Sequence, residues 1–132
     1  MKIPFTSLFI PHPKSIPEIM IKELKKHFPD AINIEWEQKK GNYEAVFYQE
    51  EAEHIAVISK EGILKEYKKN LWPFELPVKI TKECQNLGEI MNAIAIFREG
   101  RQYFEVIVRN KAFKRKVLLF DHTGLLIESQ KL

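Results

Sequence analysis

The sequence predicts an α+β fold, a tandem repeat of one helix plus four antiparallel strands that forms one antiparallel sheet with the helices on one face. Three observations predict it. The chain has 132 residues, 45% of them hydrophobic, which suffices for one cored domain. The spacing of apolar residues changes from a helical period of about 3.6 to a strand period of 2. This change occurs twice, once in each half of the chain.

The first half reads as a helix followed by four strands. Apolar residues from Ile16 to Phe28 recur at the spacing of one buried helical stripe, and Pro29 ends the helix. Alternating apolar and polar residues then predict strands over 32–37 and 43–48, joined by a glycine turn. Two further strands, 54–59 and 63–69, flank a second glycine turn.

The second half repeats this order. A short helical stretch follows Pro77 and ends at Gly88, and strands are predicted over 89–98, 101–110, 114–120 and 125–128. Residues 43–47 match residues 104–108 at an offset of 61. We therefore expect an internal duplication, with an N-terminal arm at 1–14 and repeats at 15–72 and 73–132 within one compact domain.

Composition removes several classes of protein. No run of about 18 apolar residues is present, so no membrane span is expected. The single cysteine, Cys84, excludes an intrachain disulfide and a Cys-rich zinc site. The net charge is +3, and five of the eight residues at 109–116 are basic. This cluster lacks the broad basic face with interleaved aromatics that nucleic-acid binding needs, so no nucleic acid is expected as a partner.

The N-terminal arm indicates the compartment. Its apolar stretch, Ile3 to Ile10, is interrupted by Pro4 and followed by Pro11. A secretory signal needs a longer uninterrupted apolar region and a small-residue cleavage site. We therefore expect no signal peptide and, from the sequence alone, a cytoplasmic protein. The unpaired Cys84 agrees with a reducing compartment.

No catalytic, metal or cofactor site is expected. None of the four histidines has a helical i, i+4 partner, and the five glycines are scattered among turns rather than gathered in a phosphate loop. Cys84 falls on the buried stripe of the second helix, which favours a core thiol over a nucleophile. Trp36 falls on the inner strand face. The chain is therefore expected not to be an enzyme.

The strand face that the helices leave uncovered is the candidate binding surface. A solvated face of an antiparallel sheet carries mostly polar groups, whereas here aromatic and aliphatic residues recur on it. The link between the halves adds two aromatic residues. The candidate partner-binding residues are Val46, Tyr48, Ile58, Phe97, Tyr103, Ile107, Trp72 and Phe74. The sequence leaves two other occupants of this face possible. One is the N-terminal arm, and the other is a second copy of the chain, which would form a homodimer.

Several short motifs, in this order, resemble the PepSY-like domains, which are structurally akin to the beta-lactamase inhibitor protein. The motifs are Phe28-Pro29-Asp30-Ala31, Trp36, Gly41-Asn42-Tyr43-Glu44-Ala45-Val46-Phe47, Glu61-Gly62, Leu76-Pro77, Tyr103-Phe104-Glu105 and Leu119-Phe120-Asp121-His122-Thr123-Gly124. The resemblance covers about residues 16–127. It implies a duplicated domain without catalysis, an inhibitory or protein-binding role, and relatives that are often exported to the periplasm or secreted.

Two functions follow as expectations. The first is a non-enzymatic protein- or peptide-binding domain, inhibitor-like, that uses the helix-free sheet face. The alternative is a small-molecule or anion-binding module with a pocket between the sheet and the N-terminal arm, near Lys111, Lys114 and Arg115.

Overall fold

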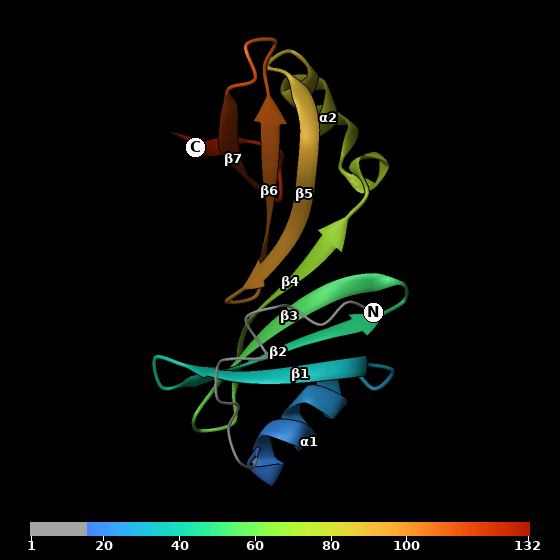
Figure 1. Ribbon diagram of the computed structural model, residues 1–132, viewed down its shortest axis with the longest axis vertical. Helices are drawn as coiled ribbons and strands as arrows, with labels where there is room; N and C mark the ends of the chain where they lie inside the picture. Colours follow the sequence, from blue (N-terminus) through green and yellow to red (C-terminus); the bar gives the residue numbers. More distant parts are fainter. Residues whose placement is uncertain (1–15) are drawn as a thin grey trace. The chain divides into compact units, whose positions relative to one another are not determined.

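A computed structural model of the chain describes residues 16–132 (Figure 1). Contacts divide the chain into two compact units, the first ending at Tyr67 and the second beginning at Lys68. The first unit holds α1 (Glu18–His27), β1 (Ile32–Lys39), β2 (Asn42–Gln49) and β3 (Ala52–Ser59). The strand β4 (Leu64–Leu71) contains the boundary. The second unit holds η2 (Pro73–Glu75), α2 (Val78–Gln85), β5 (Glu89–Arg98), β6 (Arg101–Arg109), β7 (Arg115–Asp121) and β8 (Leu126–Lys131).

The predicted fold class is wrong. Residues 16–132 form one eight-stranded antiparallel sheet with two helices, and strand residues make up 55% of this part of the chain. The fold is therefore mostly β rather than a tandem helix-plus-four-strand repeat. The strand order β1 to β8 follows the chain, and β4 spans the boundary between the units, whereas the predicted repeats meet after residue 72. Every hairpin needs alternating side chains and a turn residue with positive φ. The short sequence strings shared by the two halves therefore reflect this common local geometry.

The first core lies between α1 and one face of its strands. Met20 and Leu24 of α1 are buried against Ala45 and Phe47 of β2, together with Ala56 and Ile58 of β3. The two alanines leave room for the helix to approach the sheet. Phe28, at the end of α1, packs edge-on against Tyr67 with ring centroids 5.0 Å apart, and its centroid lies 4.8 Å from that of Phe47. Trp36 packs against this core, as predicted.

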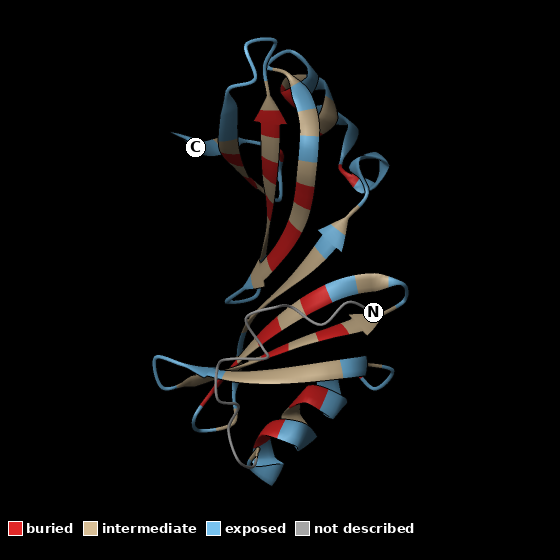
Figure 2. Ribbon diagram, viewed as in Figure 1, coloured by how far each residue is buried: buried red, intermediate tan, exposed pale blue. Residues whose placement is uncertain are grey.

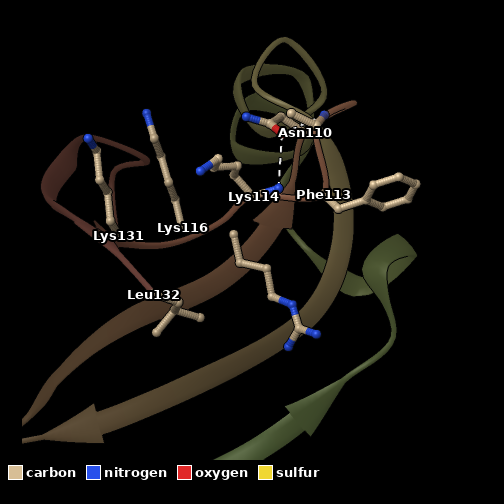
Figure 3. Close-up of a pocket in the computed structure, with 8 residues that line it drawn as sticks. Asn110, Phe113, Lys114, Lys116, Lys131 and Leu132 are labelled. Carbon is tan, nitrogen blue, oxygen red and sulfur yellow. Dashed lines mark hydrogen bonds between the residues drawn. The ribbon is translucent and has the colours of Figure 1, made fainter.

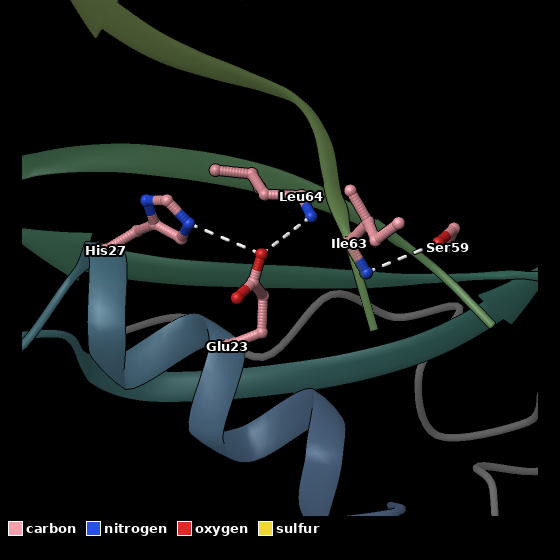
Figure 4. Close-up of polar contacts among 5 residues, drawn as sticks. All are labelled: Glu23, His27, Ser59, Ile63 and Leu64. Carbon is pink, nitrogen blue, oxygen red and sulfur yellow. Dashed lines mark hydrogen bonds and ion pairs between the residues drawn. The ribbon is translucent and has the colours of Figure 1, made fainter. Parts of the chain in front are cut away.

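A polar contact also ties α1 to the sheet (Figure 4). The Glu23 carboxylate accepts a hydrogen bond of 2.8 Å from the backbone N–H of Leu64, at the start of β4, and lies 3.3 Å from Nε2 of His27. The Glu23 side chain is only 15% exposed, so this contact is largely shielded from water. Glu23 therefore satisfies a strand amide that would otherwise lack a partner at this position.

The second core is built in the same way beneath α2, which lies beside β5 (Figure 1). Ile80 and Cys84 of α2 are fully buried against a cluster drawn from β5, β6 and β7. Buried and partly buried positions alternate along β6 (Figure 2), as expected for a strand with one face in the core. The cluster members from the strands are Ala93, Ala95, Phe104, Val106, Val108, Leu118 and Phe120.

Cys84 is a core thiol. It is fully buried, and burial, followed by the charge of Glu83, raises its pKa to about 11. The thiolate is the reactive form of cysteine, so at neutral pH this group is protonated and shielded. The structure thus agrees with the core role predicted for Cys84.

Replacing Glu23 with Ala should destabilise the first unit by about 1–3 kcal/mol, because the Leu64 N–H loses its partner in a shielded position. The matched control is Glu18→Ala on the same helix. Its ion pair with Lys22 is exposed at both ends, so the cost should be much smaller. Urea denaturation followed by circular dichroism measures both free energies of unfolding. Equal losses in the two variants would contradict the role given to Glu23.

Cys84 should react with a thiol reagent such as dithiobisnitrobenzoate at pH 8 at least about 100-fold more slowly in the native protein than in urea, since a pKa raised by two units lowers the thiolate fraction by that factor. Absorbance at 412 nm follows the reaction, and Cys84→Ala supplies the blank. A native rate equal to the denatured rate would show that the thiol is accessible.

Candidate functional site

The side chains of β5, β6 and β7 that point away from the second core form a largely apolar surface. Directly opposed residues of antiparallel strands lie on the same face, and the register places Ile96 opposite Tyr103 and Ile107 opposite Val117. Glu105 lies between Ile94 and Leu119. Asn92 lies opposite Ile107 and Asp121 lies opposite Tyr103, so both share this face. We call this set the open face of the second unit: Asn92, Ile94, Ile96, Tyr103, Glu105, Ile107, Val117, Leu119 and Asp121.

Six of these nine residues are apolar or aromatic. Ile96 is buried, at 3% exposure, although it lies outside the second core cluster, and the other eight are partly buried. The Tyr103 ring lies beneath the Arg98 guanidinium, with 5.9 Å between the Arg98 Cζ and the ring centroid. Such a cation–π contact restrains the orientation of the ring. This open face therefore presents ordered apolar area on a strand scaffold.

The corresponding surface of the first unit is mixed. The register places Val46 between Glu35 and Ile55, and Val57 opposite Glu44. Lys39 forms ion pairs with both Glu37 and Glu44, at 3.4 and 3.8 Å. We call this set the open face of the first unit: Glu35, Glu37, Glu44, Val46, Tyr48, Glu53, Ile55 and Val57. Three aliphatic residues thus lie among four carboxylates.

Tyr48 lies at the acidic margin of that face. Its hydroxyl donates a hydrogen bond of 3.3 Å to Glu53, its cross-strand neighbour. The negative charge of Glu53 is the main cause that raises the pKa of Tyr48 above its usual value, with smaller effects from burial, the hydrogen bond and Glu35. The phenol is therefore protonated and remains a donor across the physiological pH range.

The structure places half of the predicted partner-binding residues on these open faces. Val46 and Tyr48 lie on the first, and Tyr103 and Ile107 lie on the second. Their role in binding stays a prediction.

The placement of Ile58 and Phe97 on the open faces is wrong. Ile58 is opposite Tyr43 and is fully buried in the first core. Phe97 is opposite Gln102 and packs against the second core cluster. In both strands apolar residues occupy successive positions, so alternation alone does not define which residues face the helix. The hairpin register, which pairs residues of different strands, decides it.

The same successive apolar residues mark the positions that sequence reasoning missed. Ile94 and Ile96 alternate with Ala93 and Ala95, so both parities of β5 are apolar. Residues 117–120 repeat this pattern in β7. A continuous apolar run in an antiparallel strand indicates two apolar faces, and this signal identifies the missed residues of both units. They are Ile55, Val57, Ile94, Ile96, Val117 and Leu119.

Trp72 and Phe74 form a separate exposed feature at η2. Trp72 is 66% and Phe74 81% exposed, and their rings stack with centroids 6.3 Å apart and 12° between the planes. The Trp72 backbone N–H donates a hydrogen bond of 2.9 Å to the Glu75 carboxylate, which fixes the turn. These two predicted site residues are therefore exposed and ordered.

Three further features concern the N-terminal arm, metal sites and membrane-spanning helices. The N-terminal arm, and with it the pocket predicted between arm and sheet, lies outside the described residues. Within residues 16–132, no group of three or more His, Cys, Asp or Glu side chains is placed to hold a metal ion. No helix in that part of the chain combines the length and apolar character needed to cross a membrane.

Comparison with known proteins shows likeness at the level of the fold. No family model matches the chain, and no curated protein matches it. A BLIP-like protein from Bacteroides fragilis, named for the beta-lactamase inhibitor protein, is 20% identical with a TM-score of 0.78, over 96% of this chain and 91% of that chain. A DUF2874 family protein from Bacteroides uniformis is 18% identical with a TM-score of 0.80, over 89% and 90%. A protein from Bacteroides eggerthii, provisionally named periplasmic, is 19% identical with a TM-score of 0.77, over 89% of each chain.

These likenesses confirm the BLIP-like part of the predicted fold. None of these three proteins is named as PepSY-like, so membership of that family stays a prediction. The fold of the chain is BLIP-like, a single antiparallel sheet with two helices.

Proposed function

We propose that this chain is a non-enzymatic binding domain that holds a protein or peptide on the open faces of its strands. The observation that carries the proposal is the apolar character of the open face of the second unit. Six of its nine residues are apolar or aromatic, on strands whose opposite side already packs in a core. Apolar area of this kind is typical of an interaction site.

Tyr103 and Ile107 are the residues that we expect to contribute most. Aromatic side chains dominate binding energies at interfaces because they bury large area at little entropic cost. The contact with Arg98 restrains Tyr103 before any partner binds. Strand backbones hold Ile107 and Val117 at fixed spacing, so the partner meets a preorganised surface.

The negative charge on the open face of the first unit favours some partners over others. The carboxylates of Glu35 and Glu53 flank Val46 and Tyr48, and the described residues give neither of these two acids an ion-pair partner. A partner that contacts this face needs basic groups around an apolar centre, because like charges would repel and buried carboxylates need partners. We therefore expect a basic rather than an acidic contact segment at the first unit.

The comparisons support the general class of this proposal. The name of the Bacteroides fragilis protein points to a fold used by an inhibitor, and none of the similar structures is named as an enzyme. An inhibitor-like role for this chain is part of the proposal. The provisional name of the Bacteroides eggerthii protein supports an exported location over the cytoplasmic one expected from the sequence.

Replacing Tyr48 and Tyr103 with Ser should weaken partner capture by about tenfold or more, because truncating interface aromatics commonly costs more than 1 kcal/mol each. The measurement is a quantitative pull-down from extract of cells that produce the protein, followed by titration of the captured partner with each purified variant.

The matched control replaces one exposed apolar residue of each unit that lies off the open faces, Ile19→Ser in α1 and Leu125→Ser in the turn before β8. Circular dichroism checks that all variants fold. Unchanged capture by the folded tyrosine variant, or equal loss in the control, would refute the assignment of these faces. If only a second copy of the chain is captured, the open faces form a homodimer interface rather than a site for another protein.

A further inference from the structure

A basic hollow lies at the end of the second unit where the β6–β7 turn meets the end of β8. Its volume is about 750 Å³, within the range of small-molecule sites. Four of its eight lining residues are cationic, and none is Asp or Glu. Figure 3 shows Lys116 and Lys131 side by side, with Lys114 beside them and Phe113 at the margin. We define the basic hollow by Lys114, Arg115, Lys116 and Lys131.

The strand register brings Lys116 and Lys131 together against their mutual repulsion. Lys116 lies directly opposite Lys131, and Arg115 lies directly opposite Arg109. Opposed residues of antiparallel strands have Cβ atoms only about 4.5–5.5 Å apart, and like charges at such positions are destabilising. Because successive side chains of a strand point to opposite faces, the Lys116–Lys131 pair lies on one face of β7 and the Arg109–Arg115 pair on the other.

Within the described part of the chain, no Asp or Glu side chain pairs with the cations of the basic hollow. Within residues 16–132, none of these four side chains has an ion-pair partner, whereas Arg109 is paired with Glu89 at 3.2 Å. Lys22 and Lys39, in the first unit, are also paired. An unneutralised cluster of this density is an anion-attracting site.

The backbone around the hollow is fixed by hydrogen bonds. The Asn110 side-chain oxygen accepts two of them, from the N–H groups of Ala112 and Lys114, at 2.9 and 3.0 Å. The Leu132 N–H donates to the Arg115 carbonyl at 3.1 Å, which extends the β7–β8 pairing to the hollow. The backbone that carries the cationic side chains is therefore already held in place, so a bound anion does not have to order it.

We propose that the basic hollow binds a small organic anion carrying at least two phosphate groups. Lys116 and Lys131 supply compact point charges on one face of β7, with Lys114 beside them in the lining, whereas Arg115 belongs to the opposite face of the strand. Phe113 and Leu132 line the same hollow and offer apolar contact to the organic part. Lys111, expected from the sequence at this site, is not among the lining residues.

This site is independent of the proposed protein-binding function. It shares no residue with the open face of either unit, so each can fail without the other. An acidic protein segment is the competing occupant, and it would need to follow the surface beyond the hollow. The size of the hollow and the facing pair of Lys116 and Lys131 favour the small anion.

The test is isothermal titration with pyrophosphate at low ionic strength. Replacing Lys116 and Lys131 with Gln should lower the affinity for pyrophosphate by about tenfold or more, because two charge-assisted contacts are lost. The matched control, Lys22→Gln with Lys39→Gln, removes the same charge from the first unit and should leave the affinity within about twofold. Pyrophosphate should also bind more tightly than sulfate.

Melting temperature gives a second readout. Without anion, the Lys116→Gln, Lys131→Gln variant should melt at or above the temperature of the natural chain, because a repulsive pair is removed. Pyrophosphate should raise the melting temperature of the natural chain and of the control, but not of this variant. Equal pyrophosphate affinity in both double variants, equal binding of sulfate, or binding of an oligoglutamate peptide without binding of pyrophosphate would overturn the proposal.

Discussion

The alternation of side chains along paired strands is the constraint on which the rest of the structure depends. Because successive side chains of a strand point to opposite faces, the register of each strand pair determines which residues enter the core and which lie on the surface. In β5 and β6 the core receives Ala93, Ala95 and Phe104, and the open face receives Ile96 and Tyr103. The binding surface is therefore a direct consequence of how the core is assembled.

Each unit closes its core with one short helix. The α1 helix contributes Met20 and Leu24, and α2 contributes Ile80 and Cys84, all fully or almost fully buried. A helix of eight or ten residues covers one face of a few strands, so an apolar second face remains without a helix of its own. Strands with two apolar faces and a single covering helix leave surface that a partner can occupy.

Local features were predictable from the sequence, and pairings between strands were not. The turns, the helix positions and the inner position of Trp36 follow from glycines and apolar spacing within a few residues. Strict alternation would put Ile32 on the same face as Trp36, but Ile32 is 60% exposed because a bulge with Asn33 at φ 54° shifts the register of β1. Ile58 and Phe97 were misplaced because their faces depend on a partner strand. Lys131 joins the basic hollow only through its pairing with Lys116, which no local pattern records.

The central claim is that the open face of the second unit, and not the surface near the helices, contacts the partner. Methyl-resolved NMR of the labelled chain with its captured partner tests this most directly. The account predicts that the methyl signals of Ile107, Val117 and Leu119 shift and lose their exposure to a soluble paramagnetic probe, while those of Ile80 and Leu118 in the core stay unchanged. Changes confined to methyl groups on the exposed sides of α1 and α2 would contradict it.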